Sequence, residues 1–599
     1  MSSREVPALS KSTTGKIYGI NGPVIYIKGQ TEFKMSEMVY VGKEKLVGEV
    51  ISLDKDRTTI QVYEETSGLR PGELVESTGS SVSVTLAPGI LNNIFDGIER
   101  PLESIAEHGG AFISRGVSVD SLDTEKKWST HITVKEGDLV HGGSIFAEVP
   151  ETRAITHKCM VPPEVGSAVV VSVVEDGDYT IGDVLIRIRR SNGEIDELTM
   201  TQKWPIRVPR PVHKRFPASV PLVTGQRVLD TMFPIAKGGT AAIPGGFGTG
   251  KTMTQHQIAK WSDADIIVYI GCGERGNEMT QVLEEFSELV DPKSGNPLMD
   301  RTTLIANTSN MPVAAREASI YTGITLAEYY RDMGYDVAIM ADSTSRWAEA
   351  LRELSGRLEE MPAEEGFPAY LASRLSAFYE RAGMMQTLGG ETGSVSIIGA
   401  VSPQGGDFSE PVTQNTKRFV RCFWGLDKSL AYSRHFPAIH WLTSYSEYTT
   451  DLSGWYIDHV SPKFVDYRNR LMSILGQENS LMEIVKLIGS DVLPDDQKLI
   501  LEIAKVIRLG FLQQNAFHKD DTCVSLEKQF KMMDVILYLY KKSRKLIAMG
   551  HPMSVLKREG IFEKVIAIKY DVPNDNLALL DLYKNEIDAF YDLVLEKNA

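Results

Sequence analysis

Cysteine is scarce in this sequence, and the few that occur are far apart. Only Cys159, Cys272, Cys422 and Cys523 are present among 599 residues. They form no C-x-x-C pair, which argues against a zinc site or a thioredoxin-like redox motif. We therefore expect reduced thiols, as in proteins of a reducing compartment.

The sequence also lacks a long apolar run. Nowhere do about 18 or more apolar residues follow one another, the length that a membrane-spanning helix requires. Residues 1–15 are polar and lack the apolar segment of a secretion signal. We expect a soluble chain that meets a membrane only through partner subunits.

Positive charge is not in excess. The formal net charge is −15 and the isoelectric point lies near 5.4, which argues against a general nucleic-acid-binding surface. With 42% hydrophobic and 24% charged residues the composition is that of a globular protein. The length of 599 residues predicts roughly three or four domains.

The most informative stretch matches the pattern G-x-x-x-x-G-K-[ST] of a phosphate-binding loop. It reads Gly245-Gly246-Phe247-Gly248-Thr249-Gly250-Lys251-Thr252. In such loops the backbone N–H groups surround an anion, the lysine reaches the β- and γ-phosphates, and the final hydroxyl can ligate Mg²⁺. The alternative is a glycine-rich turn that matches by chance.

The residues on either side favour the phosphate-binding interpretation. Residues 240–244 predict a short buried strand, and residues 253–261 predict a helix whose N-terminus faces the phosphates. Strand, loop and helix therefore follow in the required order. The segment is expected to bind a triphosphate.

The periodicity changes along the chain and predicts a multidomain protein. Residues 1–88 comprise a leader and short alternating segments typical of a small β-barrel, and residues 89–200 predict a β-rich insertion with linkers. Residues 201–443 alternate apolar runs with helical stretches, the pattern of a central α/β domain with a mainly parallel sheet. Residues 444–599 have helical apolar spacing and predict an α-helical domain.

Two acids follow strands of the predicted parallel sheet. Asp342 ends the apolar run 337–341 and would present a carboxylate to Mg²⁺ through a bridging water; the alternative is a helix-capping acid. Glu274 follows the strand after the loop's helix and could polarise an attacking water as a general base. The alternative for Glu274 is a structural acid paired with Arg275.

Longer segments carry a family resemblance. They are GCGERGNE at 271–278, NTSNMPVAAREAS at 307–319 and ADSTSRWAEALRE at 341–353, and the similarity runs from QVYEETSG at 61–68 to QQNAF at 513–517. These segments resemble the catalytic A subunit of V-type and A-type rotary ATPases. The resemblance covers nearly the whole chain and implies a RecA-like fold for the nucleotide-binding domain.

The resemblance also implies partners. This subunit would alternate with a B-type subunit in an A₃B₃ hetero-hexamer, with ATP or ADP and Mg²⁺ bound at the A/B interfaces. The B-type subunit would supply an arginine finger, so the isolated chain should be nearly inactive. The β-rich insertion would be the bulge that meets peripheral stalk subunits. Central rotor subunits would couple ATP hydrolysis or synthesis to H⁺ or Na⁺ movement through a membrane sector, on whose cytoplasmic side the chain would lie.

Individual roles follow from the resemblance position by position. Lys251 and Thr252 match the ligands of the phosphates and Mg²⁺, Glu274 the water-activating glutamate, and Asp342 the acid near the metal. Arg275 matches an arginine near the γ-phosphate. The adenine-side wall would be formed by Phe436, Gln514, Asn515, Ala516 and Phe517.

Two further features complete the resemblance. The turn at residues 489–496 is similar to the acidic turn that touches the rotor; its alternative is a solvated turn that caps a helix with Asp495 or Asp496. Eukaryotic A subunits carry cysteine where Thr249 stands, and that cysteine can form an inhibitory disulfide with a cysteine near the position of Cys523. Thr249 excludes this disulfide and points to a prokaryotic or archaeal enzyme.

Two other classes share the same nucleotide-binding core. A hexameric P-loop translocase, either a nucleic-acid helicase or a protein-export ATPase, is disfavoured by the acidic charge balance and the β-rich insertion. A non-catalytic ring subunit is disfavoured because Lys251, Thr252 and Glu274 are all present.

Overall fold

The computed structural model describes residues 13–29, 31–109, 115–116, 119–292 and 294–596. Most of the predicted leader, residues 1–12, lies outside these ranges. The chain divides into two compact units. Unit 1 contains Met1–Arg215, Asp265–Arg381 and Met385–Val395, and unit 2 contains Phe216–Ala264, Ala382–Met384 and Ser396–Ala599.

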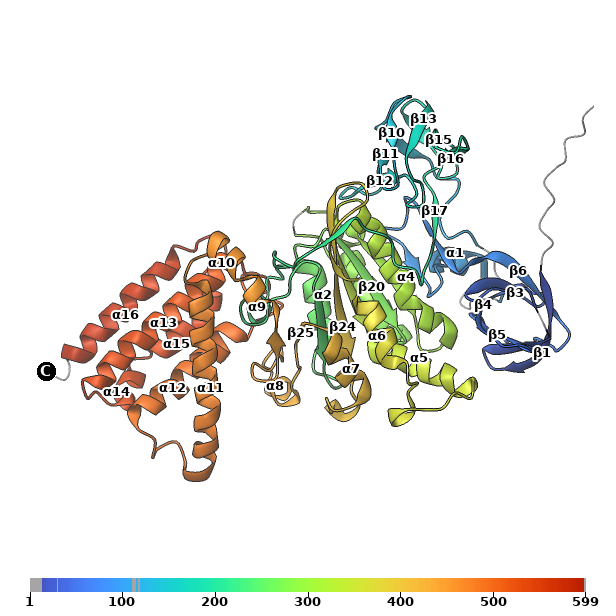
Figure 1. The fold of residues 1–599 in the computed structure, drawn as a ribbon. Coiled ribbons are helices and arrows are strands. Elements are labelled where there is room, and N and C mark those ends of the chain that lie inside the picture. The colour runs from blue at the N-terminus through green and yellow to red at the C-terminus, as the bar shows by residue number, and fades with distance from the viewer. Residues whose placement is uncertain (1–12, 30, 110–114, 117–118, 293, 597–599) are drawn as a thin grey trace, which may run out of the picture. The chain divides into compact units, whose positions relative to one another are not determined.

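The N-terminal part of unit 1 is a closed β-barrel in the strand order β1-β2-β5-β4-β3-β6 (Figure 1). In β3, buried residues alternate with partly exposed ones, so one side of the strand faces the barrel interior. That interior is filled mainly by valine and isoleucine side chains. The barrel strands are β1 (Thr14–Asn21), β2 (Val24–Lys28), β3 (Glu37–Val41), β4 (Leu46–Leu53), β5 (Arg57–Val62) and β6 (Leu74–Ser81).

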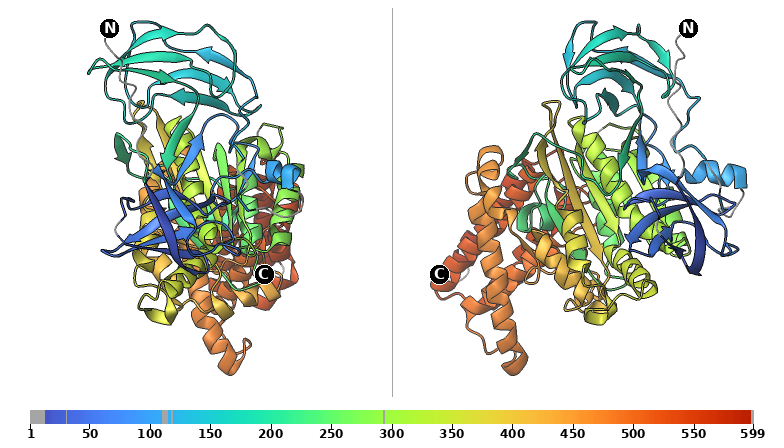
Figure 2. Two further views of the ribbon diagram at one scale, coloured as in Figure 1. Left: turned by 90° about the vertical axis from the view of Figure 1, so that its right-hand side faces the viewer. Right: turned by 45° about the vertical axis from the view of Figure 1, so that its right-hand side comes forward.

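The β-rich insertion of unit 1 forms two four-stranded antiparallel sheets, drawn in cyan and teal in Figure 2. One sheet contains β10 (Leu139–Val140), β13 (Ala168–Val173), β15 (Ile186–Arg190) and β16 (Ile195–Leu198). The other contains β12 (Thr156–Met160), β11 (Ile145–Pro150), β9 (Trp128–Ile132) and β14 (Gly177–Tyr179). A short helix, α1 (Leu102–Gly109), precedes them. β7 (Ser83–Leu86) pairs with β17 (Gln202–Pro205), so the two ends of the insertion are joined by one antiparallel ladder.

Unit 1 also contributes parallel strands of the nucleotide-binding domain. β20 (Ile266–Cys272) pairs in parallel with β21 (Thr302–Asn307) and with β22 (Asp336–Asp342), and β21 pairs in parallel with β8 (Ile94–Phe95). Every residue of β20 is buried, as expected for a parallel strand covered on both faces. The helices of this part are α3 (Gly276–Glu288), α4 (Val313–Asp332), α5 (Thr344–Arg357) and α6 (Leu371–Tyr379).

Unit 2 holds the strand that precedes the phosphate loop. β19 (Thr240–Pro244) is wholly buried and pairs in parallel with β24 (Thr392–Val401) on one side and β25 (Cys422–Phe423) on the other. β24 contains residues of both units. Helices α2 (Lys251–Trp261), α7 (Pro411–Phe419) and α8 (Lys428–Tyr432) belong to the same part of unit 2.

The C-terminal part of unit 2 is helical. Its helices are α9 (Tyr448–Asp451), α10 (Ser453–His459), α11 (Phe464–Ile488), α12 (Asp495–Val506), α13 (Leu526–Ala548), α14 (Met553–Arg558), α15 (Ile561–Asp571) and α16 (Leu579–Glu596). After Val506, α12 continues as the π-helical segment η5 (Ile507–Leu512). β26 (Tyr445–Ser446) lies inside the range predicted to be helical, because it pairs antiparallel with β25.

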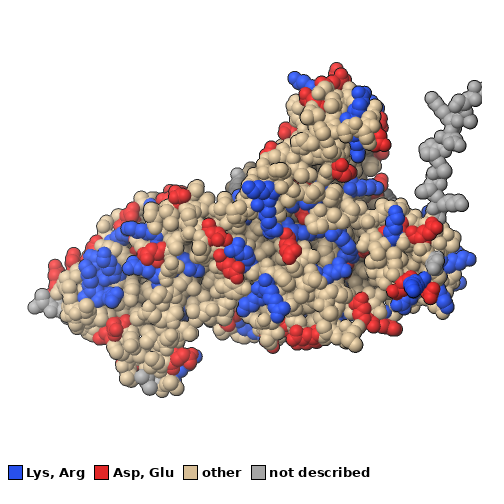
Figure 3. All heavy atoms as spheres, viewed as in Figure 1, with Lys and Arg blue, Asp and Glu red and all other residues tan. Residues whose placement is uncertain are grey.

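The predicted fold class is confirmed: the chain combines an N-terminal barrel, a β-rich insertion, a mainly parallel central sheet and C-terminal helices. The domain boundaries stay a prediction. Within the described residues, no helix is both long enough and apolar enough to span a bilayer. On the face drawn in Figure 3, acidic and basic side chains are interspersed, so the net charge of −15 does not form a single acidic field there.

None of the four cysteines forms a disulfide, and three of them, Cys159, Cys272 and Cys422, are buried. Burial raises the pKa of the Cys272 and Cys422 thiols to about 12. It also raises the pKa of the Cys159 thiol above the usual range. Cys523 is half-buried.

Candidate active site

The glycine-rich loop connects β19 directly to α2. Gly248 and Gly250 have φ values of +75° and +89°, in the left-handed region that favours glycine. A Cβ atom at Gly245 would lie 2.8 Å from Cβ of Leu426, so there is little room for a side chain at this position. The predicted strand, loop and helix are therefore all present in the expected order.

The loop is held in shape by its own side chains. Thr249 is buried and its hydroxyl donates to the carbonyl of Gly246 at 2.8 Å, while the Lys251 ammonium donates to the carbonyls of Gly245 at 2.8 Å and Gly246 at 3.2 Å. Gly250 is the N-cap of α2, which begins at Lys251, two residues before the predicted start. The first N–H groups of a helix have no partner within it and attract anions, so this end of α2 is suited to phosphate.

A cavity of about 620 Å³ adjoins the loop within unit 2. Its lining includes Gly248 and Gly250 of the loop, and also the five residues that the resemblance assigned to the adenine wall: Phe436, Gln514, Asn515, Ala516 and Phe517. Phe517 is 90% exposed and Phe436 is 41% exposed, which leaves aromatic surface available to a planar ligand. The phosphate loop and the predicted wall thus surround one cavity.

Part of this lining was not predicted from the sequence. Met253, Thr254 and Gln257 of α2 contribute, and helical spacing after the phosphate loop could have indicated them. Arg434 and Tyr570 also line the cavity. Tyr570 lies on α15, and no motif in the sequence links that helix to the loop.

The predicted acids lie together in unit 1. Asp342 is the last residue of β22, is 3% exposed, and accepts a hydrogen bond from the Tyr269 hydroxyl at 3.3 Å. In the parallel ladder its Cα is paired with that of Gly271, three residues before Glu274. The two carboxylates therefore stand at the same carboxyl edge of adjacent strands, where ligands of parallel sheets bind.

Glu274 is half-buried, and its surroundings disfavour its charged form. Desolvation, the negative charge of Asp342 and a hydrogen bond with Glu278 raise its pKa to about 8, against the opposing effect of Arg346. A carboxylate with a pKa near the working pH is well suited to take a proton from water. Gly273 precedes this residue with a φ of +73°, a conformation that favours glycine. A Cβ atom at Gly273 would also lie 2.7 Å from Cβ of Arg346, so there is no room for a side chain.

Three arginines surround this edge in different ways. Arg275 is exposed and is the N-cap of α3. Arg316 donates to the carbonyl of Ser309 at 2.9 Å, and Arg346 forms an ion pair with Glu349 at 2.9 Å. Only Arg275 was predicted from the sequence, whereas the positive charge that acts on Glu274 is that of Arg346.

Together these features define the chain as a P-loop nucleotide-binding protein of the α/β class. Family models agree along the chain. The ATP synthase alpha/beta family models match residues 17–79 (β-barrel domain), 119–207 (barrel-sandwich domain) and 225–446 (nucleotide-binding domain). The model for the C-terminal domain of V and A type ATP synthase matches residues 453–556.

Individual relatives are similar over nearly their full length. The V-type ATP synthase alpha chain 2 of Clostridium tetani is 59% identical, covering 98% of this chain and 99% of that protein. The V-type ATP synthase alpha chain of Halothermothrix orenii is 60% identical, with 97% and 99% covered. The A subunit of the A-type ATP synthase of Methanopyrus kandleri is 54% identical, with 98% and 100% covered.

The chain belongs to the family of alpha, or A, subunits of V-type and A-type ATP synthases. The predicted function as a catalytic subunit of such an ATP synthase is thereby confirmed, and the translocase alternative is not favoured. A solved structure of the assembled ATPase EscN of the enteropathogenic E. coli type III secretion system has a TM-score of 0.62 at 20% identity, covering 87% of this chain and 100% of EscN. At that identity the likeness shows the fold alone.

Proposed function

We propose that this chain binds MgATP on the phosphate loop and the adjoining cavity and hydrolyses or synthesises it at an interface with a B-type subunit. The observation that carries the proposal is the loop itself, placed between a buried strand and the N-terminus of α2 and opening on a cavity of about 620 Å³. Lys251 would exchange its loop carbonyls for phosphate oxygens. Phe436 and residues 514–517 would contact the base.

Glu274 is proposed as the base that orients the attacking water and accepts its proton. Its raised pKa supports this role, since its deprotonated form is a stronger base than an ordinary glutamate carboxylate. Arg275 is proposed to lie near the γ-phosphate. Its exposure leaves it able to reach a ligand, but its role follows only from family membership.

Thr252 and Asp342 are proposed as the protein donors for Mg²⁺, Asp342 through water. Both offer hard oxygen atoms, and one or two such donors plus substrate phosphates are a usual set for this ion. Within the described residues no three His, Cys, Asp or Glu side chains gather as a metal site. When bound, Mg²⁺ supplies positive charge to the β- and γ-phosphates.

The remaining partners are proposed from family membership. The B-type subunit completes an A₃B₃ ring and supplies the arginine finger, peripheral stalk subunits meet the β-rich insertion, and the chain lies on the cytoplasmic side of a membrane sector. Central rotor subunits would contact residues 489–496. Val492 in this turn is 68% exposed, and Asp495 and Asp496 begin α12.

Two substitutions test this proposal. Lys251→Ala is expected to abolish ADP binding by the chain, measured by calorimetry, because the phosphates lose their cation. Glu274→Gln, mixed with a B-type partner, is expected to bind nucleotide normally but to lose at least about a hundredfold in hydrolysis rate, the scale of general-base catalysis. Glu284→Gln is the control, since Glu284 is an exposed residue of α3. Undiminished hydrolysis by the Glu274→Gln complex would remove Glu274 from the mechanism.

A further inference from the structure

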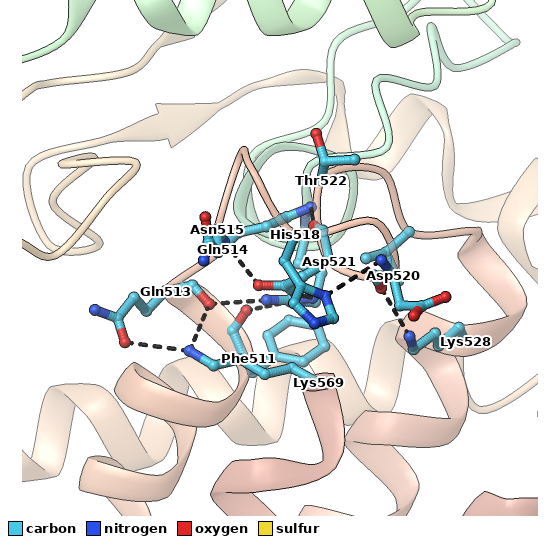
Figure 4. A network of polar contacts seen from close by, with 12 residues as sticks. Phe511, Gln513, Gln514, Asn515, His518, Asp520, Asp521, Thr522, Lys528 and Lys569 are labelled. Atoms are coloured by element: carbon cyan, nitrogen blue, oxygen red, sulfur yellow. Dashed lines mark hydrogen bonds and ion pairs between the residues drawn. The ribbon is translucent and has the colours of Figure 1, made fainter. Parts of the chain in front are cut away.

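The wall of the nucleotide cavity is a loop without regular structure. This wall loop, residues 513–521, runs between η5 and the approach to α13. Its outer side exposes Asn515 and Phe517 at the cavity. Side chains on its inner side and from elsewhere in unit 2 fix its conformation (Figure 4).

Arg227 holds both ends of the wall loop. Its side chain is fully buried at the start of the π-helical segment η1 (Val228–Met232). The guanidinium donates to the Phe511 carbonyl at 2.5 Å, to the Gln513 carbonyl at 2.8 Å and to the Asp521 carboxylate at 2.5 Å. One rigid fork therefore joins the entry of the loop to its exit.

Asp521 connects Arg227 to the middle of the wall loop. One carboxylate oxygen accepts from Arg227, and the other accepts from the backbone N–H of Asn515 at 2.7 Å. Asp521 is fully buried, and its contact with Arg227 is shielded from water. The residue that faces the cavity is thus held directly by the buried carboxylate.

The Gln514 side chain forms hydrogen bonds on the inner side of the wall loop. Its amide N–H groups donate to the carbonyls of Asp521 at 2.7 Å and Gly225 at 2.9 Å, and its oxygen accepts from the backbone N–H of Arg227 at 2.8 Å. Although Gln514 lines the cavity, its side-chain polar atoms are engaged within the protein. Its contribution is to shape the wall.

The negative charge of Asp521 also acts on two nearby lysines, Lys528 and Lys569. Lys569 donates to the Leu509 carbonyl at 2.6 Å, and Lys528 donates to the Asp520 carbonyl at 3.0 Å. Desolvation lowers the pKa of both lysines to about 8, and the negative charge of Asp521 opposes that decrease. Replacing Asp521 by a neutral residue therefore leaves Arg227 without its carboxylate partner and lowers the pKa of both lysines further.

We propose that Asp521, fixed by Arg227, is a positioning residue for the nucleoside end of the nucleotide. It sets the conformation of the wall loop against which the base and ribose lie, while the phosphates are held separately by the loop of residues 245–252. This inference rests on the proposed nucleotide function. It predicts that the two ends of the ligand respond differently when the carboxylate is altered.

The test compares two ligands that share the phosphate end. Calorimetry on the full chain measures affinity for ADP and for inorganic tripolyphosphate. Asp521→Asn keeps the side-chain shape but turns one acceptor into a donor facing Asn515 or Arg227, so ADP affinity is expected to fall tenfold or more with tripolyphosphate affinity unchanged. Asp534→Asn is the matched control, because Asp534 of α13 is a half-buried carboxylate that accepts from the Tyr467 hydroxyl at 2.8 Å and lies outside the wall loop.

The outcomes separate the inference from the function on which it rests. Equal losses for both ligands, or an unchanged ratio of their affinities, overturn the positioning role. A wild-type chain that binds neither ligand overturns the proposed function itself. If circular dichroism shows that Asp521→Asn does not fold, Arg227→Lys takes its place, because lysine keeps the positive charge but lacks the forked guanidinium. The same selective loss of ADP affinity is then expected. An unchanged ratio of ADP affinity to tripolyphosphate affinity refutes the inference.

Discussion

Replacing Glu274 by glutamine is expected to stabilise the isolated chain at alkaline pH. The raised pKa means that the folded chain keeps a proton between pH 4.5 and about 8 that the unfolded chain has released. Wild-type stability therefore falls as the pH rises through this window. Each pKa unit corresponds to about 1.4 kcal/mol, so the full shift corresponds to at most about 5 kcal/mol. Because Glu274 is only half-buried, screening by solvent reduces this to about 2 kcal/mol.

The assay is urea unfolding of the nucleotide-free and magnesium-free chain at pH 5.5 and pH 9. Glu274→Gln should gain about 1.5 kcal/mol over wild type between these two pH values, since part of the window lies below pH 5.5. Glu284→Gln, on the exposed face of α3, should show no such pH-dependent difference. A stability difference between Glu274→Gln and wild type that is independent of pH would refute the claim that desolvation and Asp342 hold this carboxyl group in its protonated form.

Two further substitutions address the scaffold. Arg207→Ala should lower the free energy of unfolding in urea by about 3–5 kcal/mol, because it leaves two buried carboxylates, Glu49 at 2.9 Å and Glu317 at 2.8 Å, as unpaired charges. As the control, Arg187→Ala should cost under about 1 kcal/mol, because Arg187 is exposed. Equal losses for the two variants would contradict this account. Glu410→Ala should cost about 1 kcal/mol, since the Glu410 side chain caps α7 through two backbone N–H groups, and an unchanged midpoint of thermal unfolding would show that the cap is dispensable.

The strands and the phosphate loop could be predicted because their signals are local. The apolar runs at 266–270, 303–306 and 337–341 lie within β20, β21 and β22, and the loop motif lies between β19 and α2. The acids could also be placed, because an acid that follows a parallel strand must stand at the carboxyl edge of the sheet. Family resemblance, and not periodicity, placed Phe436 and residues 514–517 on the cavity.

Contacts between distant residues that carry no motif could not be predicted. Arg227 and Asp521 are 294 positions apart, and nothing around either residue suggests a buried ion pair. Tyr570 reaches the cavity from a helix whose pattern only predicts burial of one face. The raised pKa of Glu274 likewise depends on burial and on the charge of Asp342, two properties of the folded chain.

The distribution of thiols offers a practical means of watching the wall loop. A thiol reagent needs both access and thiolate, and the three buried cysteines provide neither, because burial keeps their pKa high. Cys523, the half-buried one, follows the wall loop by two residues and lies against Gly225. A fluorophore attached at this native position would test whether the wall loop moves when nucleotide binds, in an otherwise unmodified chain.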